Sequence, residues 1–176
     1  FRRPRSRSLA SLRAAVLRAK KYRDKVGLVG AAVSDHCAID DLAAFILAQG
    51  MKFSVASLRA DSFTPGLARA LAASGHRTVT FAPEAAGERL RRVINKTLTD
   101  EDLERAVALA VQAGIPNIRL YFMLGLPTEE NADIAAIADL ARRIRRRMTA
   151  FGSRGRLTLS INPFIPKPFT PFQWLP

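Results

Sequence analysis

The pattern of apolar and polar positions alternates between helix-like and strand-like segments along the chain. Apolar residues at helical spacing, with N-cap and glycine stop signals, predict helices over 9–22, 39–49, 65–74, 88–96, 100–113 and 129–149. Apolar and β-favouring runs predict strands over 26–33, 53–57, 78–82, 117–124 and 157–162. Because no two predicted strands are adjacent in sequence, their connections must be parallel crossovers. The pattern therefore predicts an α/β fold with parallel strands.

Two architectures fit this alternation, an open doubly wound sheet and a barrel. The run 26–33 is apolar without alternation, which is typical of a parallel strand covered on both faces. The chain contains neither a G-x-G-x-x-G segment nor a Walker phosphate loop, so dinucleotide-binding and P-loop folds are disfavoured. We therefore favour a barrel. Since the first predicted element is a helix, we expect an incomplete barrel whose first strand is missing.

The central feature of the sequence is the predicted strand 78–82, which is followed by Pro83, Glu84 and a basic segment. Glu84 is predicted to lie at the carboxyl end of a parallel strand, the edge where α/β folds bind their ligands. Arg89, Arg92 and Lys96 are spaced i, i+3 and i+7, which predicts one cationic stripe on a helix. The alternative is a solvated surface helix with a glutamate near its N-terminus, where the helix dipole favours it.

Other strand ends contribute residues with candidate ligand-binding side chains that a parallel sheet would bring to the same edge. These residues are Asp35, His36, Ser57, Arg59, Tyr121 and Met123. Carboxylates and hydroxyls in such a set can bind a sugar, and Arg59 or Lys96 can bind a carboxylate or phosphate. Asp35, His36 and Cys37 are consecutive, which suits none of the usual zinc-ligand spacings, so we predict no metal ligands there.

The net charge and the cysteine content restrict the expected binding partners and cellular compartment. The 176 residues carry a net charge of +13, which favours polyanionic surroundings such as nucleic acid, phosphorylated ligands or an acidic partner. The arginines between 142 and 147 span much of a helix circumference and are expected to form a solvated outer face. A single cysteine excludes a disulfide framework and favours a reducing, cytoplasmic setting. No apolar run approaches the ~20 residues of a membrane-spanning helix.

Several motifs together resemble those of the radical SAM superfamily. They are Ala82-Pro83-Glu84-Ala85, Glu88-Arg89, Ile94-Asn95-Lys96, Gly125-Leu126-Pro127-Thr128-Glu129, Pro166-Lys167-Pro168 and Thr170-Pro171-Phe172-Gln173-Trp174. The resemblance covers nearly the whole chain. It is strongest to large radical SAM proteins that often carry a cobalamin-binding-type domain ahead of the barrel.

This resemblance implies a fold, cofactors and an activity. Members have a partial (β/α)6 TIM-type barrel, bind a [4Fe–4S] cluster and reductively cleave S-adenosylmethionine (SAM) to a 5′-deoxyadenosyl radical. We expect residues 1–162 to form this barrel without its first strand, and residues 163–176 to form a proline-rich, aromatic tail leading to a further C-terminal region. In relatives, a C-x-x-x-C-x-x-C loop that holds the cluster precedes the stretch resembling 2–8. Because that loop is absent here, we expect the chain alone to be inactive and its cluster ligands to lie elsewhere in a longer protein.

The resemblance also assigns roles to individual residues. Glu84 corresponds to a polar residue that contacts SAM near its ribose, and Lys96 to a basic residue that meets the SAM carboxylate. The strand bearing Tyr121 and Met123 frames the adenosine. Ser57 and Arg59 occupy a further SAM-facing strand end. The usual glycine-rich G-G-E segment is represented only by residues 30–35. Cobalamin is an additional expected cofactor of the full-length protein, and the substrate, small or an RNA or protein, stays open.

Two other functions fit the sequence. A basic α/β module could dock RNA or a protein partner through its arginine faces without catalysis. A conventional barrel enzyme could use Glu84 on a phosphorylated substrate, in which case sugar phosphates and not SAM would bind.

Overall fold

The computed structural model describes residues 5–30 and 32–174. The helices are α1 (Leu9–Lys20), α2 (Ile39–Ala48), α3 (Pro65–Ala73), α4 (Glu88–Val93), α5 (Asp100–Gln112), α6 (Asn131–Ala150) and a short 3-10 helix, η1 (Val33–Asp35). The strands are β1 (Lys25–Gly27), β2 (Lys52–Ser54), β3 (Thr78–Glu84), β4 (Asn117–Leu124) and β5 (Leu157–Pro163). Helices and strands alternate as the sequence predicts, which confirms the α/β class.

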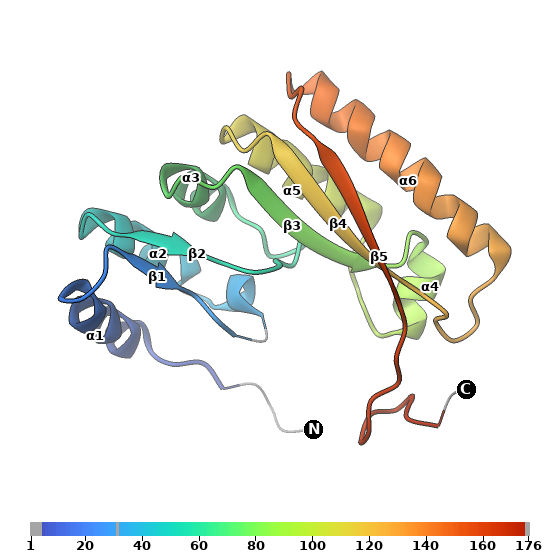
Figure 1. Ribbon diagram of the computed structural model, residues 1–176, viewed down its shortest axis with the longest axis horizontal. Helices are drawn as coiled ribbons and strands as arrows, with labels where there is room; N and C mark the ends of the chain where they lie inside the picture. The colour runs from blue at the N-terminus through green and yellow to red at the C-terminus, as the bar shows by residue number, and fades with distance from the viewer. Residues whose placement is uncertain (1–4, 31, 175–176) are drawn as a thin grey trace.

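All strand pairs are parallel. One sheet contains β1 and β2, and a second has the order β3-β4-β5. An isolated parallel bridge between Leu58 and Phe81 links the two sheets, and the Leu58 amide donates to the Thr80 carbonyl at 2.9 Å. Figure 1 shows the strands as one curved row, with α3 and α5 behind it and α6 beside β5. The carboxyl ends of β3, β4 and β5 meet near α4.

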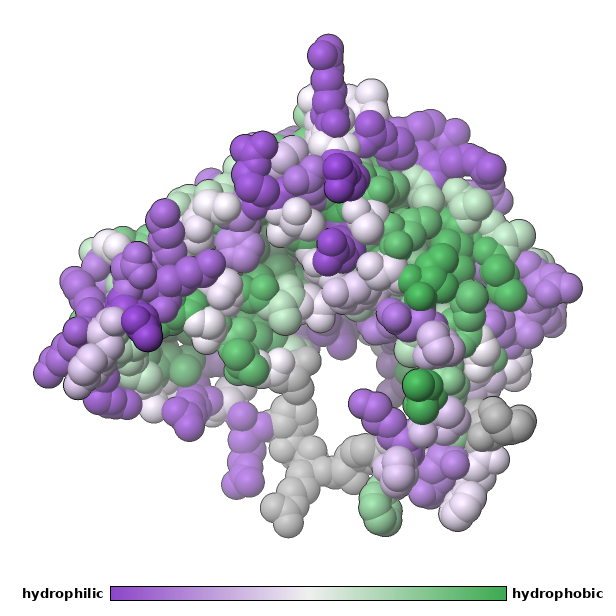
Figure 2. Space-filling model, viewed as in Figure 1, coloured by the Kyte–Doolittle hydropathy of each residue, from purple (hydrophilic) through white to green (hydrophobic). Residues whose placement is uncertain are grey.

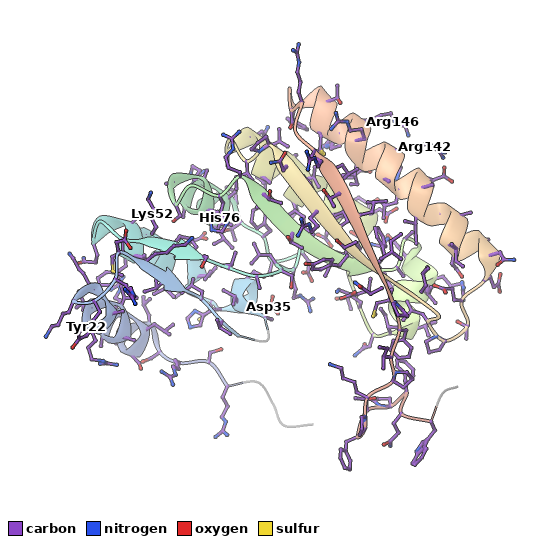
Figure 3. The ribbon with its side chains drawn as sticks, in the orientation of Figure 1. Tyr22, Asp35, Lys52, His76, Arg142 and Arg146 are labelled. Carbon is purple, nitrogen blue, oxygen red and sulfur yellow. The ribbon has the colours of Figure 1, made fainter. Side chains whose placement is uncertain are left out.

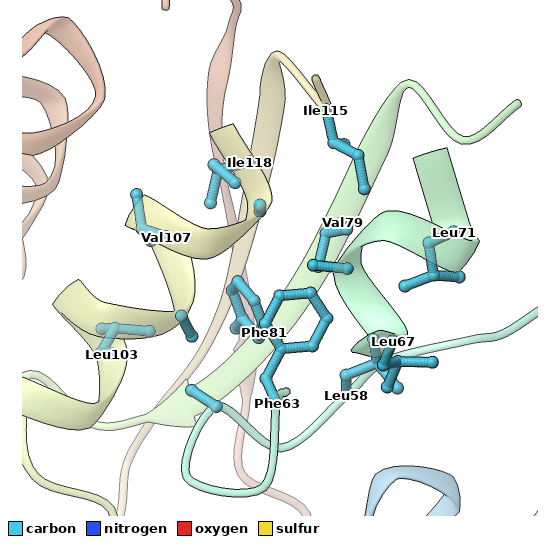
Figure 4. Close-up of a cluster of buried hydrophobic side chains, with 14 of the residues drawn as sticks. Leu58, Phe63, Leu67, Leu71, Val79, Phe81, Leu103, Val107, Ile115 and Ile118 are labelled. Atoms are coloured by element: carbon cyan, nitrogen blue, oxygen red, sulfur yellow. The ribbon is translucent and has the colours of Figure 1, made fainter. Parts of the chain in front are cut away.

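The core lies between the three-stranded sheet and its helices. Val79 and Phe81 of β3 and Ile118 and Leu120 of β4 are buried, while the residues between them face the other side of the sheet. The ring of Phe63 packs edge-on against Phe81, with 5.2 Å between the ring centroids. Figure 4 shows Val79, Phe81 and Ile118 beside labelled side chains of α3 and α5. Because alternate residues of a strand point to opposite faces, the second face of the sheet is left for ligands.

The prediction of a long buried strand over 26–33 is wrong. Only Lys25–Gly27 pairs with β2, and the ladder ends where the Leu28 amide donates to the Ser54 carbonyl at 2.8 Å. Val29 is 97% exposed. The run is apolar by composition but rich in glycine and alanine, which bury little surface and favour no strand. The chain therefore leaves the sheet after three residues and enters η1.

The predicted cationic stripe Arg89, Arg92 and Lys96 is also wrong. Helix α4 ends at Val93, and Asn95 adopts a left-handed conformation with φ of 56°. Asparagine tolerates this conformation better than most residues. Lys96 is therefore outside the helix, and the chain turns it back toward β3.

The long helix α6 begins two residues later than its sequence signals predict. Thr128 is not its N-cap and instead has a left-handed φ of 64°. Glu130 is the N-cap, and its side chain and that of Asp133 form a reciprocal capping box. Within the described residues, no helix is long and apolar enough to cross a membrane.

Candidate functional site

The candidate site is built around Glu84 at the carboxyl end of β3. The register of β3 with β4 shifts between Phe81 and Glu84, and Glu84 has a φ of 67°. A left-handed conformation is costly for a residue with a Cβ atom, and such strain is concentrated at functional sites. The Glu84 carboxylate accepts a hydrogen bond from Lys96 Nζ at 3.1 Å, and both side chains are three-quarters or more buried.

Lys96 reaches Glu84 because the chain reverses directly after α4. The left-handed Asn95 ends the helix, and the Lys96 amide donates to the Arg91 carbonyl at 2.8 Å. The turn brings an ammonium group over the end of a strand twelve residues earlier. The result is a mostly buried pair of opposite charges. A ligand with hydroxyl and carboxylate groups could bind between them, with its hydroxyls on Glu84 and its carboxylate on Lys96.

Tyr121 and Met123 lie beside Glu84 on the neighbouring strand. Glu84 pairs with Phe122, so the two residues on either side of Phe122 occupy the same end of the sheet as Glu84. Phe122 is fully buried, whereas Tyr121 and Met123 are partly exposed on the opposite face. Met123 also packs against a small apolar cluster with Ala85, Leu90 and Leu126 at its centre. The strand end thus offers an apolar surface next to an ion pair.

Arg89 ties this site to the segment 125–129. Its guanidinium donates to the Thr128 hydroxyl at 3.1 Å and to the Thr128 carbonyl at 2.9 Å, and it forms an ion pair with Asp133. In the same segment, the Gly125 amide donates to the Glu129 carboxylate at 2.6 Å. These bonds hold the loop after β4 against α4, so the two motifs that are distant in sequence form one structure.

Sequence reasoning missed Arg91, the most deeply buried charged residue of this region. Its side chain is 0% exposed and donates to the Leu98 carbonyl at 3.0 Å and the Ala86 carbonyl at 3.1 Å. It also pairs with Asp100, which receives a second ion pair from Arg143. The available signal was weak: Arg91 lies three residues before Ile94, at the edge of the apolar side of the helix.

Ser57 and Arg59 lie on a different part of the edge, after β2. Ser57 is exposed. Arg59 donates to both oxygens of Asp61, at 3.1 and 2.5 Å, and lies 3.5 Å from Asp35. Figure 3 shows Asp35 at this end of the first sheet. Among the hydrogen bonds and ion pairs of the described residues, none joins Ser57 or Arg59 to Glu84.

The ion pair between Arg59 and Asp61 is expected to set the pKa of Asp61. Partial burial acts to raise the pKa of Asp61, but the hydrogen bond and charge of Arg59 outweigh it and lower the pKa below its ordinary value. In the Arg59→Gln variant we expect the pKa of Asp61 to rise to its ordinary value or above, because the burial stays and the cation is lost. Carboxyl-carbon NMR titration measures this change.

Asp102 is the internal control for that titration. Burial acts to raise its pKa too, while Arg105 and Thr99 lower it, and the net pKa is below the ordinary value. Its titration should not move in Arg59→Gln. A carboxylate with a lowered pKa stabilises the fold above its unfolded pKa, and this stabilisation is lost as pH falls through the folded pKa. The Asp61 contribution to acid destabilisation should therefore disappear in the variant, and an unchanged Asp61 pKa would contradict the assignment.

The described residues do not fit a [4Fe–4S] cluster. Such a cluster requires several thiolates, and the chain has one cysteine, Cys37, which is exposed. In the described part of the chain, no group of three or more histidine, cysteine, aspartate or glutamate residues could hold a metal ion. His36 has a structural role: its Nδ1 accepts from the Ala38 amide at 3.1 Å, and its Nε2 lies 2.9 Å from the Arg7 carbonyl.

Comparisons with solved structures show the fold. The chain superimposes on Escherichia coli coproporphyrinogen III oxidase (HemN), a radical SAM enzyme, with a TM-score of 0.60 and 14% sequence identity. The superposition covers 91% of this chain and 37% of HemN. For HydG, a maturase of the [FeFe]-hydrogenase, the TM-score is 0.54 with 16% identity, 94% of this chain and 38% of that chain. The predicted partial barrel agrees with these likenesses.

Comparisons of sequence show the family. The chain is 37% identical over 150 residues to the uncharacterized protein MJ0966 of Methanocaldococcus jannaschii, a match that covers 85% of this chain and 32% of the relative. The chain thus spans about a third of the length of that relative. The family model of the radical SAM superfamily matches residues 1–141. The chain therefore belongs to the radical SAM superfamily, as its motifs predict.

Proposed function

We propose that this chain is the SAM-holding part of a radical SAM enzyme and that SAM binds at the carboxyl ends of β3 and β4. The observation that carries the proposal is the mostly buried pair of Glu84 and Lys96, 3.1 Å apart at the end of a strained strand. Family membership supports SAM as the ligand. A carboxylate, an ammonium group and an apolar surface side by side match the ribose, the methionine carboxylate and the adenine of SAM.

Each residue then has a role that follows from its chemistry. The Glu84 carboxylate accepts hydrogen bonds from ribose hydroxyls, and the Lys96 ammonium binds the methionine carboxylate. Without ligand, the two groups satisfy each other, so binding exchanges one ion pair for two charge-assisted contacts. Tyr121 and Met123 provide the surface against which adenosine packs. Arg59 is already engaged by Asp61, so we assign it and Ser57 to shaping the same edge.

The chemistry belongs to the cofactors. Together with a reduced [4Fe–4S] cluster, which would supply one electron for its reductive cleavage, bound SAM would supply the radical chemistry for hydrogen abstraction from the substrate. The described residues do not hold the cluster, so we propose that its ligands lie in another part of a longer protein and that the chain alone is inactive. The cobalamin-binding domain is untested by the matches and stays a prediction.

The first test is the affinity for SAM, measured by equilibrium dialysis with the full-length protein. We expect Glu84→Gln and Lys96→Met each to weaken binding about ten- to a hundredfold, because each removes a charge-assisted hydrogen bond worth roughly 1.5–3 kcal/mol. The matched control is Arg92→Gln. The Arg92 side chain is 73% exposed, and its ion pair with Glu88 is long, at 4.0 Å. Equal affinities in all four proteins would refute these contacts.

The second test is the reaction. The full-length protein is reconstituted anaerobically with iron and sulfide, supplied with SAM and dithionite, and assayed for 5′-deoxyadenosine. Product that falls in both site variants supports the proposal. A folded protein that takes up no cluster and forms no product refutes the enzymatic function and favours a binding module. Protection from proteolysis by sugar phosphates, and not by SAM, would favour a conventional barrel enzyme.

A further inference from the structure

A cavity of about 1200 Å³ lies at the amino ends of β3, β4 and β5, far from the candidate SAM site. It is bounded by the starts of the three strands, the segment before β5 and one side of α6. Six arginines line it, and together we call them the arginine groove: Arg119, Arg142, Arg145, Arg146, Arg154 and Arg156. Figure 3 shows Arg142 and Arg146 on α6 at this end of the molecule, and Figure 2 shows hydrophilic side chains along the same edge.

We infer that the arginine groove binds the phosphate backbone of a nucleic acid. No carboxylate is among the residues that line it. Arg142 pairs with Asp139 at 2.6 Å, but both side chains are about 70% exposed, and such pairs contribute little. Arg145 donates to the Gly155 carbonyl at 2.5 Å and is thereby directed to the groove.

The groove concentrates cations that repel one another. Its six guanidinium groups come from three neighbouring segments, β4, α6 and the chain before β5. They line one cavity, so salt with a screening length of about 8 Å does not fully screen them from one another. Such a cluster raises the local concentration of anions and is stabilised when phosphates enter it. Guanidinium groups match phosphate oxygens in two-point hydrogen bonds, which favours phosphate over isolated carboxylates.

The openness of the groove favours a polymer over a small ligand. All six arginines are exposed, whereas a small-molecule site buries most of its ligand and has an apolar lining. No aromatic residue lines the groove, so bases have no stacking platform there. The contacts are therefore expected to be with the backbone and to read no sequence.

The groove is separate from the site of the proposed function. Along β4, Met123 lies six residues beyond Asn117 and four beyond Arg119, which corresponds to roughly 13–20 Å between the groove and Met123. The sequence predicted arginines 142–147 to be one solvated face, but the structure divides them. Arg143 pairs with Asp100, and Arg147 stacks on Phe151 with 4.8 Å to the ring centroid. Only Arg142, Arg145 and Arg146 face the groove.

The test measures binding of fluorescein-labelled U20 RNA to the full chain by anisotropy, without SAM. Uridine stacks poorly, so the probe reports phosphate contacts. Arg142→Gln, Arg146→Gln and Arg156→Gln are combined in a groove variant. We expect about tenfold or greater weakening at 100 mM KCl. We also expect the slope of log affinity against log salt to fall by about 2, because each single-strand phosphate contact contributes about 0.7.

The matched control removes the same charge from α1 and the turn after it. Arg18→Gln, Lys21→Gln and Arg23→Gln are combined, and all three side chains are exposed. We expect less than threefold weakening and an unchanged slope. Equal weakening in both triple variants would overturn the inference, since it would show attraction by net charge alone. Displacement of U20 by poly-glutamate of equal charge would also overturn it, in favour of an acidic protein partner. Because SAM is absent from the assay, its outcome does not depend on the proposed function.

Discussion

Replacing Arg91 by alanine is expected to lower the free energy of unfolding by about 3–5 kcal/mol. The fully buried guanidinium satisfies the carbonyls of Ala86 and Leu98 and pairs with Asp100. Its removal leaves two buried carbonyls without donors, each costing about 1–3 kcal/mol, and opens a cavity under α4. Asp100 keeps the ion pair with Arg143, which limits the loss. Urea denaturation monitored by circular dichroism measures the change.

The neighbouring Arg92 provides the matched control. Its side chain is 73% exposed and lies 4.0 Å from Glu88, an arrangement worth little in water. Arg92→Ala should change the free energy of unfolding by less than about 0.5 kcal/mol. If the two alanine variants unfold at the same urea concentration, the buried network is not what holds α4.

Arg91 also connects stability to the candidate site. It joins the chain just after Glu84 to the chain just after Lys96, since its partners Ala86 and Leu98 lie two residues beyond each. The 3.1 Å contact between the Glu84 and Lys96 side chains is therefore supported by the side chain of Arg91, which donates hydrogen bonds to neither residue. Arg91 is a positioning residue for the pair in this sense.

The sequence predicted the elements whose signals are local. The helix predicted over 100–113 is confirmed as α5, which begins with a capping box in which the side chains and backbone of Thr99 and Asp102 bond reciprocally. Strand β4 is confirmed over its full range. These signals depend on neighbours within a few residues, which the sequence displays. The strand predicted over 26–33 failed because burial depends on which helix covers a segment, and apolar composition alone does not determine it.

The site was predictable in one respect and not in another. The position of Glu84 at a strand end follows from the β-favouring run before it. The family resemblance assigned Lys96 to the same ligand as Glu84 but predicted no contact between them, while the spacing argument placed Lys96 on a helix that stops at Val93. The structure achieves the contact through the left-handed Asn95. The burial of Arg91 and the arginine groove depend on tertiary packing, which the sequence does not display. The adjacent residues Arg91 and Arg92 therefore look alike in the sequence, although Arg91 is fully buried and Arg92 is exposed.

Replacing Gly155 by alanine is expected to destabilise the chain by about 3 kcal/mol and to disrupt the arginine groove. A Cβ atom at this position would lie 1.9 Å from the carbonyl oxygen of Pro116 and 2.4 Å from its carbonyl carbon. These are backbone atoms just before β4, so they cannot move aside as a flexible side chain would. The start of β5 would have to separate from the start of β4. For a chain of this length, we expect a fall in Tm of roughly 6–12 °C, measured by thermal denaturation.

The same displacement would break a local hydrogen-bond network. The Ser153 hydroxyl donates to the Pro116 carbonyl at 2.9 Å and accepts from the Gly155 amide at 3.1 Å, while the Gly155 carbonyl receives Arg145. Gly27→Ala is the control, because its Cβ would meet nothing closer than 3.9 Å and its backbone is not left-handed. It should be neutral within about 0.5 kcal/mol or slightly stabilising. If Gly155→Ala has the same Tm as Gly27→Ala and keeps the wild-type affinity for U20, the amino ends of β4 and β5 are not closely packed. If Gly155→Ala instead melts early and binds U20 weakly, then the close approach of these two strands builds the groove as well as the sheet.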